Sequence, residues 1–245
     1  MNRSCSPLQA VGIEKHFGKK VVLGRLDFEL PVGQVTVLLG RNGAGKTTLI
    51  RLCLGTERPT GGQLRILGRD PVKHASEVRR RIGFVPDVPD AYDWMTARDW
   101  FRFLRPHFPG FSMKRAIALS DSLAVPLQTP FRALSRGQAT KAMLVGAVAH
   151  APELLLLDEP FAGLDPLAHD DVLRAIISEY RAGERTVLLT THDLEVASRV
   201  ADRIAMLDGG RIVRELAPDE LEERSASGSL PAQLRHEMAE SVEVG

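Results

Sequence analysis

A glycine-rich run that ends in lysine and threonine has the spacing of a phosphate-binding loop. It reads Gly40-Arg41-Asn42-Gly43-Ala44-Gly45-Lys46-Thr47, directly after an apolar segment and directly before a helical pattern. Glycines there let backbone N–H groups face phosphate oxygens, and the following helix adds its positive N-terminal end. A glycine turn alone would not require Lys-Thr at the start of a helix. The pattern therefore predicts a nucleotide phosphate site formed by Gly40, Asn42, Gly43, Ala44, Gly45, Lys46, Thr47 and Thr48.

Individual side chains of this loop have separate expected roles. Lys46 would meet the β- and γ-phosphates, and the Thr47 hydroxyl would bind Mg²⁺. Two adjacent carboxylates, Asp158 and Glu159, follow the apolar run Leu154 to Leu157. We expect Asp158 to hold the Mg²⁺ shell and Glu159 to polarise the attacking water as a general base. Acidic residues also often simply end a strand, so without the phosphate loop this pair would favour the structural interpretation.

Two further motifs are ambiguous when read alone. His192, in Thr190-Thr191-His192-Asp193, follows a third apolar run and is positioned to bind the γ-phosphate or orient a water molecule, although a lone histidine there is more often structural. Ser135 and Gln138 have the Ser-x-x-Gln spacing of a helix capping box. The same helix start, with a serine hydroxyl and the Gly137 amide, also suits an anion. Spacing does not choose between cap and anion site.

These residues require a particular fold to position them. Apolar and charged residues alternate from Val21 to Leu30, which predicts a half-buried antiparallel strand. Continuous apolar or β-branched runs at 35–39, 154–157 and 186–190 predict parallel strands that are covered on both faces. Helical patterns at 47–55, 138–150 and 166–182 alternate with them. We therefore predict a doubly wound, mostly parallel α/β phosphate-loop NTPase fold with an N-terminal antiparallel subdomain, in which ligands collect at the strand C-termini.

The rest of the chain suggests one main domain with additions. Residues 87–134 are rich in aromatics and proline, which predicts an inserted helical subdomain within an ATPase domain of residues 1–216. Residues 217–245 form a polar tail in which Ser225 to Ser229 have the composition of a flexible linker. Most of the aromatics between Trp94 and Phe111 are expected in the core, while others are candidates for a docking groove.

Composition excludes several classes of protein. The 245 residues carry 32 basic and 31 acidic side chains, so the chain lacks the basic excess of a nucleic-acid binder. Cys5 and Cys53 form no CxxC pair, and neither a disulfide framework nor a zinc site is indicated. No segment approaches the roughly 18 apolar residues that a membrane span needs. A membrane role would therefore require a separate membrane-embedded chain.

Taken in order, the motifs resemble those of the ATP-binding-cassette (ABC) ATPases. Leu134-Ser135-Arg136-Gly137-Gln138, Asp158-Glu159-Pro160, Gly163-Leu164-Asp165 and Thr191-His192-Asp193 follow the phosphate loop as they do in that family, over roughly Leu8 to Leu216. The resemblance implies an ATPase that dimerises head to tail, most simply as a homodimer. The element from Ser135 to Gln138 would then close over ATP held by the other subunit, with Ser135 and Gly137 touching the γ-phosphate. Phe17 matches the position whose ring stacks on adenine, with an ordinary strand aromatic as the alternative.

Two residues depart from the family pattern. Asp87 follows Ile82-Gly83-Phe84-Val85-Pro86 where the family usually has a Gln that contacts Mg²⁺ and the attacking water. Asp87 would reach the metal, directly or through water, or stand back from it. Arg136 replaces the first glycine of the usual Gly-Gly, and would lie beside the phosphate site or extend into solvent. With a basic residue at this position, the chain resembles a branch of small bacterial export-type cassettes.

The resemblance implies the ATP-hydrolysing subunit of an ABC transporter. It would bind ATP and Mg²⁺, work with a separate membrane-embedded subunit, and lie in the cytoplasm on the inner face of the membrane. One alternative is a non-transport cassette ATPase that acts as a conformational clamp, although the tandem cassettes or long coiled-coil insertion of that class are absent from this sequence. The other alternative is a regulatory ATP-binding module with little turnover, which Asp87 and Arg136 keep open.

Overall fold

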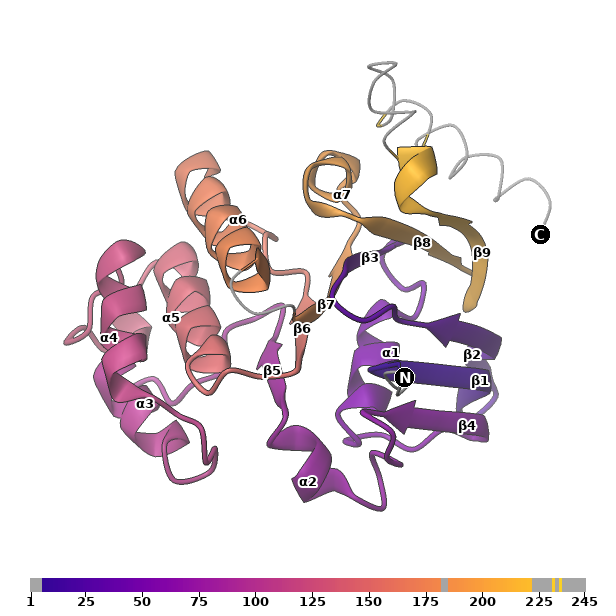
Figure 1. Ribbon diagram of the computed structural model, residues 1–245, viewed down its shortest axis with the longest axis horizontal. Helices are drawn as coiled ribbons and strands as arrows, with labels where there is room; N and C mark the ends of the chain where they lie inside the picture. The colour runs from indigo at the N-terminus through magenta and orange to yellow at the C-terminus, as the bar shows by residue number, and fades with distance from the viewer. Residues whose placement is uncertain (1–5, 182–184, 222–230, 232–233, 235–245) are drawn as a thin grey trace, which may run out of the picture. The chain divides into compact units, whose positions relative to one another are not determined.

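The chain forms two compact units that combine strands with helices (Figure 1). A computed structural model describes residues 6–181, 185–221, 231 and 234. The first unit, here called the flanking unit, comprises residues 1–79 and 186–245. The second, here called the central unit, comprises residues 80–185. The predicted α/β class is confirmed, because parallel strands, an N-terminal antiparallel sheet and helices are all present.

The flanking unit begins with a three-stranded antiparallel sheet in the order β2-β1-β4. Its strands are β1 (Leu8–Phe17), β2 (Lys20–Glu29) and β4 (Gly61–Ile66), which lie side by side in Figure 1. In β2, Leu26 and Phe28 are buried while the charged residues beside them are exposed, so the predicted alternation is confirmed.

A second set of strands in the flanking unit carries the predicted binding motifs. Its order is β7-β3-β8-β9, in which β7, β3 and β8 are parallel and β9 is antiparallel to β8. Every residue of β3 and β7 is buried, which explains why their sequences are apolar or β-branched throughout. The strands are β3 (Val35–Leu39), β7 (Thr186–Thr191), β8 (Arg203–Asp208) and β9 (Arg211–Leu216). The helices of this unit are α1 (Lys46–Cys53), α2 (Ala75–Arg79) and α7 (Leu194–Val200).

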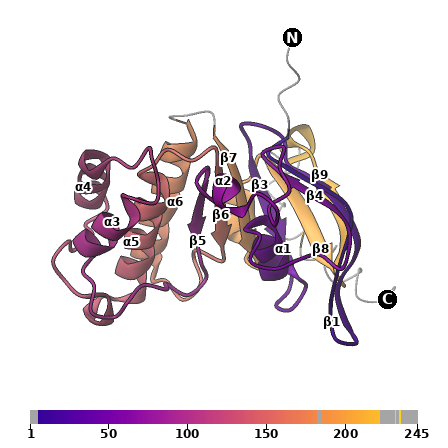
Figure 2. The same ribbon diagram turned by 90° about the horizontal axis from the view of Figure 1, so that it is seen from below.

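The central unit packs its helices around α5 (Figure 2). Helix α5 (Arg136–Val148) contacts α3, α4, α6 and strand β5, and its residues from Ala139 onward are all buried. A helix that is buried on every side needs small residues, and at Gly146 a Cβ atom would lie 2.9 Å from the Trp100 side chain. The other elements are β5 (Ile82–Val85), β6 (Leu154–Asp158), α3 (Ala97–Leu104), α4 (Met113–Ser122), the 3₁₀ turn η1 (Phe131–Ala133) and α6 (Pro166–Arg181).

The predicted elements are present with small shifts at their ends. The helix predicted at 138–150 starts earlier, at Arg136, because Ser135 is its cap and the capping box lies across the first turn. The segment 87–134 contains α3, α4 and η1, as its helical interpretation requires, but its boundary as a separate subdomain stays a prediction. The proposed linker Ser225–Ser229 lies outside the described residues.

The aromatic residues of the central unit are divided between core and surface. Phe101, Phe111 and Phe131 are buried, whereas Tyr92 and Trp94 are exposed and stack on each other with ring centroids 5.9 Å apart. The expected core position is therefore confirmed for some of these aromatics, and the docking groove stays a prediction. None of the described helices is long and apolar enough to cross a membrane.

His150 is a buried titratable group in the central unit. Its Nε2–H donates to the carbonyl oxygen of Ile82 at 3.1 Å, and its ring packs against Phe108. Burial lowers the pKa of His150 from 6.5 to about 4, because the charged imidazolium would lose water that the protein does not replace. The folded unit therefore keeps this histidine neutral at pH values where an unfolded chain protonates it.

This difference predicts a pH dependence of stability. The contribution of neutral His150 is fully present above pH 6.5 and declines as the pH falls toward 4, since the unfolded state binds the proton first. The full loss amounts to about 3 kcal/mol for a shift of this size. We expect His150→Gln, which cannot titrate, to lose less stability between pH 7 and pH 5 than wild type in urea unfolding followed by circular dichroism. The exposed-site variant His107→Gln is the control, and equal losses in wild type and His150→Gln would contradict the assignment.

Candidate functional site

The phosphate loop leaves the centre of the flanking unit's parallel strands along a path that only glycine permits. The Gly40 N–H donates to the Thr191 carbonyl at 3.1 Å, and a Cβ at Gly40 would lie 2.5 Å from the Leu207 carbonyl oxygen. Gly45 has φ +111°, and a Cβ there would lie 2.7 Å from the Leu23 side chain. Both positions combine close backbone approach with little room, so alanine would displace the loop.

The helix that follows the loop differs from its neighbours in how it begins. Helices α3, α4, α5 and α7 start with side-chain caps from Thr96, Ser112, Ser135 and Asp193. Helix α1 has Gly45 as its N-cap, and this residue provides no side-chain cap. Its first N–H groups and the positive end of its dipole are therefore directed at the loop, as an anion site requires.

Lys46 places its charge inside this loop. The side chain is buried, and its ammonium group donates to the carbonyl oxygens of Gly40 at 2.6 Å and Arg41 at 3.2 Å. A buried ammonium is stabilised by such acceptors, because it leaves bulk water. The loop thus holds the cation against the backbone that is expected to receive phosphate.

Two other predicted residues of the flanking unit are exposed. His192 follows Thr191, the last residue of β7, whose carbonyl oxygen binds the Gly40 amide. The histidine and the phosphate loop therefore leave neighbouring strands at the same edge. Phe17 ends β1 and is 45% exposed, with the Lys15 ammonium 4.6 Å from its ring centroid. One side of the ring is taken by this cation, and enough of the ring is exposed for another planar group to stack.

The predicted carboxylates lie in the central unit. Asp158 ends β6 and is almost completely buried, and Glu159 has the left-handed backbone angle φ +46°. Such a conformation is unfavourable for glutamate and occurs often at functional positions. Val85 of β5 pairs with Leu157 of β6, so Asp87 leaves the same edge of this strand pair as Asp158 and Glu159. The register thus brings these three acidic residues to one edge.

The start of α5 has both a helix cap and backbone donors suited to an anion, the two interpretations between which the sequence did not choose. Ser135 Oγ accepts the Gln138 N–H at 3.2 Å, and Gln138 Oε1 accepts the Ser135 N–H at 3.0 Å, which completes the capping box. Among the residues that the structure describes, no acceptor binds the backbone N–H of Arg136 or Gly137. The serine is therefore a helix cap, and two backbone donors beside it are available to an anion.

The two residues that depart from the family pattern contact each other. Arg136 Nη2 donates to Asp87 Oδ1 at 3.0 Å and to the Asp87 carbonyl oxygen at 3.2 Å. Arg136 therefore does not simply extend into solvent. The two positions are 49 residues apart, and their opposite charges are the one sequence feature that hints at a contact.

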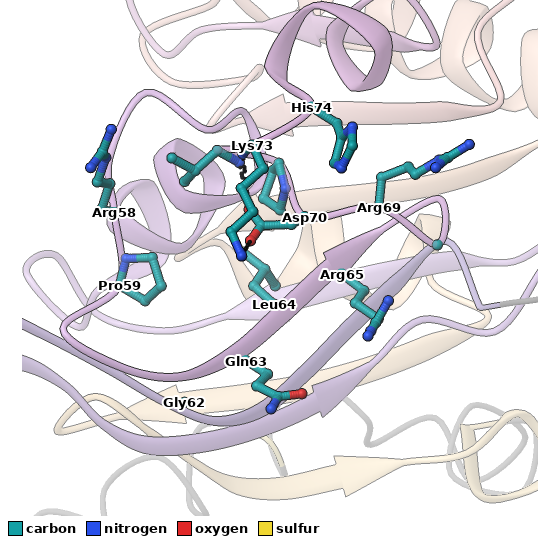
Figure 3. Close-up of a pocket in the computed structure, with 13 residues that line it drawn as sticks. Arg58, Pro59, Gly62, Gln63, Leu64, Arg65, Arg69, Asp70, Lys73 and His74 are labelled. Carbon is teal, nitrogen blue, oxygen red and sulfur yellow. Dashed lines mark hydrogen bonds and ion pairs between the residues drawn. The ribbon is translucent and has the colours of Figure 1, made fainter.

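A large hollow lies away from these motifs, in the flanking unit beside β4. It has a volume of about 800 Å³ and several basic residues line it. Lys73 points toward Asp70, whereas Arg58, Arg65 and Arg69 point in separate directions (Figure 3). Because these cations do not converge on one point, the hollow does not form an anion site comparable to the phosphate loop.

Comparison with known proteins identifies the family. The family model described as "ABC transporter" matches residues 23–162, which is more than half of the chain. This chain belongs to the ABC transporter family. It is an ATP-binding subunit of that family, and ATP hydrolysis is the family's activity.

Named relatives of this ABC subunit include both exporters and importers. It is 33% identical over 249 residues to the Nod factor export ATP-binding protein I of Burkholderia orbicola, an alignment that covers 96% of this chain and 81% of the relative. It is 35% identical over 243 residues to the aliphatic sulfonates import ATP-binding protein SsuB of Pseudomonas putida, which covers 97% and 86% respectively. The relatives therefore do not fix a direction of transport.

Solved structures agree with this assignment. The ATP-binding subunit of an ABC transporter superposes with a TM-score of 0.83 at 28% identity and covers 96% of this chain and 100% of that one. A dimeric ATP-binding cassette bound to ADP and Pi has a TM-score of 0.77 at 22% identity, covering 86% and 98%. The second likeness supports the fold alone.

The contacts of Lys46 predict a specific loss on mutation. We expect Lys46→Ala to weaken ATP binding about 10- to 100-fold, because a charged donor to phosphate is removed. Titration with a fluorescent ATP analogue measures this affinity. Lys73→Ala removes an exposed lysine of the same unit and is expected to bind like wild type. Unchanged affinity in Lys46→Ala would remove this lysine from the nucleotide site.

Proposed function

We propose that two copies of this chain bind two ATP molecules between them and use ATP-driven closure and opening to move a separate membrane-embedded subunit. In each site, the phosphate loop of one copy faces Ser135 and Gly137 of the other. The available N–H groups at the start of α5 are the observation that most directly supports this arrangement. If these N–H groups were already hydrogen-bonded within the chain, they could not bind the γ-phosphate of ATP held by a second copy.

The residues are suited to Mg²⁺ as well as ATP. Thr47 offers an exposed hydroxyl at the first turn of α1, and Asp158 offers a carboxylate at the end of β6. Oxygen donors of this kind suit Mg²⁺, which usually completes its shell with phosphate oxygens and water and does not need an all-protein cage. Bound there, Mg²⁺ would neutralise the charge that develops on the β- and γ-phosphates.

Several side chains would carry the remaining roles in ATP hydrolysis. Lys46 and the α1 N–H groups would bind and orient the phosphates, and Glu159 would accept the proton from the attacking water. His192, at the end of β7, would bind the γ-phosphate or fix the water's orientation. Positioning and electrostatic stabilisation then provide most of the catalysis, as in other phosphoryl transfers.

The role of Glu159 has a distinct kinetic signature. We expect Glu159→Gln to bind ATP with nearly wild-type affinity but to lose at least about 100-fold in turnover, because the amide has the same shape and cannot accept the proton. Phosphate release and ATP-analogue titration measure the two quantities. Asp170→Asn, on α6 of the same unit, is the control. Retained turnover in Glu159→Gln would exclude it as the base, and wild-type chain without any turnover would favour a regulatory module.

Exposed apolar residues of the central unit are a candidate binding surface for a membrane-embedded partner. Tyr92 and Trp94 are exposed by 59% and 64%, and Val88 by 64%. Exposed aromatics of this size are enriched at the centres of protein interfaces, where burial in a partner removes them from water. Tyr92 and Trp94, here called the aromatic patch, follow Asp87 closely in the chain. A partner bound there would place this subunit on the cytoplasmic face of the membrane.

The aromatic patch can be tested separately from hydrolysis. We expect Trp94→Ser to reduce co-purification of a polytopic membrane protein from detergent-solubilised membranes at least about tenfold, the usual scale for losing a central interface aromatic. Its ATPase rate in the absence of membranes should stay at the wild-type value. Val213→Ser alters another exposed apolar residue, on β9, and should leave co-purification intact. Equal recovery with both variants would place the docking surface elsewhere, and absence of any membrane partner with wild type would favour the clamp alternative.

A further inference from the structure

One arginine side chain connects three segments of the central unit. Arg136 lies in the first turn of α5 and donates to Asp87, which follows β5. The same guanidinium packs against Gly163 in the turn after β6, where a Cβ atom would lie 3.0 Å from Arg136 Nη1. The segments after β5 and β6 and the start of α5 therefore meet at Arg136.

The electrostatics of the helix start explain why a carboxylate belongs beside this arginine. The N-terminal end of α5 carries the positive end of the helix dipole, and its first turn contains no acidic residue. Arg136 adds a full positive charge at this unfavourable end. Asp87 places a negative charge at the same point and so offsets both the dipole and the guanidinium.

The contact also constrains what Asp87 can do. Its carboxylate and its carbonyl oxygen both bind Arg136 Nη2, so side chain and backbone of this residue are held together. A backbone contact is kept by any residue at position 87, whereas the ion pair needs the carboxylate. The pair is about half exposed, at 43% for Arg136 and 47% for Asp87, so salt should screen it partly.

We infer that Asp87 and Arg136 form a brace that positions the start of α5, with Ser135 and Gly137, for the γ-phosphate of the second copy. Both are positioning residues, and Asp87 acts through Arg136 instead of binding Mg²⁺. This inference rests on the proposed two-copy site. The family usually has an uncharged residue at both positions, so the two charges here compensate each other, and removing one leaves the other unpaired.

A double-mutant cycle tests the brace through ATPase kinetics. Asp87→Gln removes the carboxylate that pairs with Arg136. It should lower kcat, because the start of α5 is then held in place less firmly. Arg136→Ala leaves a carboxylate near the phosphates and should raise the KM for ATP. We expect each single change to reduce kcat/KM about two- to fivefold, the range of a partly exposed ion pair, and the double variant to lose less than the product of the two.

Two further measurements separate a brace from a general loss of structure. Arg136→Lys keeps the positive charge and should retain kinetics close to wild type. The non-additivity should shrink at about 0.5 M salt, where charges are screened over a few ångströms.

The control is a second ion pair on the same two strands. Arg81 precedes β5 and Glu153 precedes β6, and their side chains bind each other at 2.6 Å at the end of the strands opposite to Asp87. Arg81→Gln and Glu153→Gln should lower thermal stability and leave kcat and KM unchanged. Strictly multiplicative effects of Asp87→Gln and Arg136→Ala would overturn the brace and leave the two-copy site untouched. A failure of the two-copy site would instead appear as a turnover number per chain that stays constant as the protein is diluted.

Discussion

The backbone path between β3 and α1 is the constraint on which the rest of the molecule depends. Gly40 lies so close to the Leu207 carbonyl, and Gly45 to Leu23, that neither position has room for a side chain. The fully buried β3 is flanked by β7 and β8, and this pairing fixes where the loop begins. Lys46 then sits inside the loop because α1 starts directly after Gly45. The buried sheet thus pre-organises the phosphate-binding groups, so little ordering remains for ATP to impose.

The predicted chemistry is distributed over both units. The flanking unit contributes the phosphate loop, His192 and Phe17, and the central unit contributes Asp158, Glu159 and the start of α5. In each unit the functional residues follow the C-terminal ends of parallel strands, where ligands collect in α/β folds. The central unit adds a device of its own, since Arg136 ties that helix start to Asp87 and the Gly163 turn. The positions at which this chain departs from its family thus form one contact instead of two independent changes.

The sequence predicts the elements well where periodicity and motif coincide. Strand β3 has its predicted bounds, because its continuously apolar or β-branched run lies between the polar Gln34 and the glycine at position 40. The predicted start of α5 is two residues late. Its first turn is polar and is defined by a capping box, so apolar periodicity gives no signal there. The contact of Asp87 with Arg136 is not predictable from the sequence, since 49 residues separate them and no local pattern records a tertiary ion pair. The sequence also does not predict which aromatics are exposed, because burial of Phe101 and exposure of Trp94 depend on how the central unit packs.

Mixing two inactive variants shows whether each ATP site is shared between two copies. Lys46→Ala disables the phosphate loop, and Ser135→Asp keeps a good helix cap but sets a carboxylate against the partner's γ-phosphate. In a mixed dimer, one site combines both defects and the other is intact. If the sites are shared, each variant alone is inactive and ATPase activity returns on mixing. A mixture as inactive as its components would mean that each site lies within one chain, and the two-copy arrangement would be wrong.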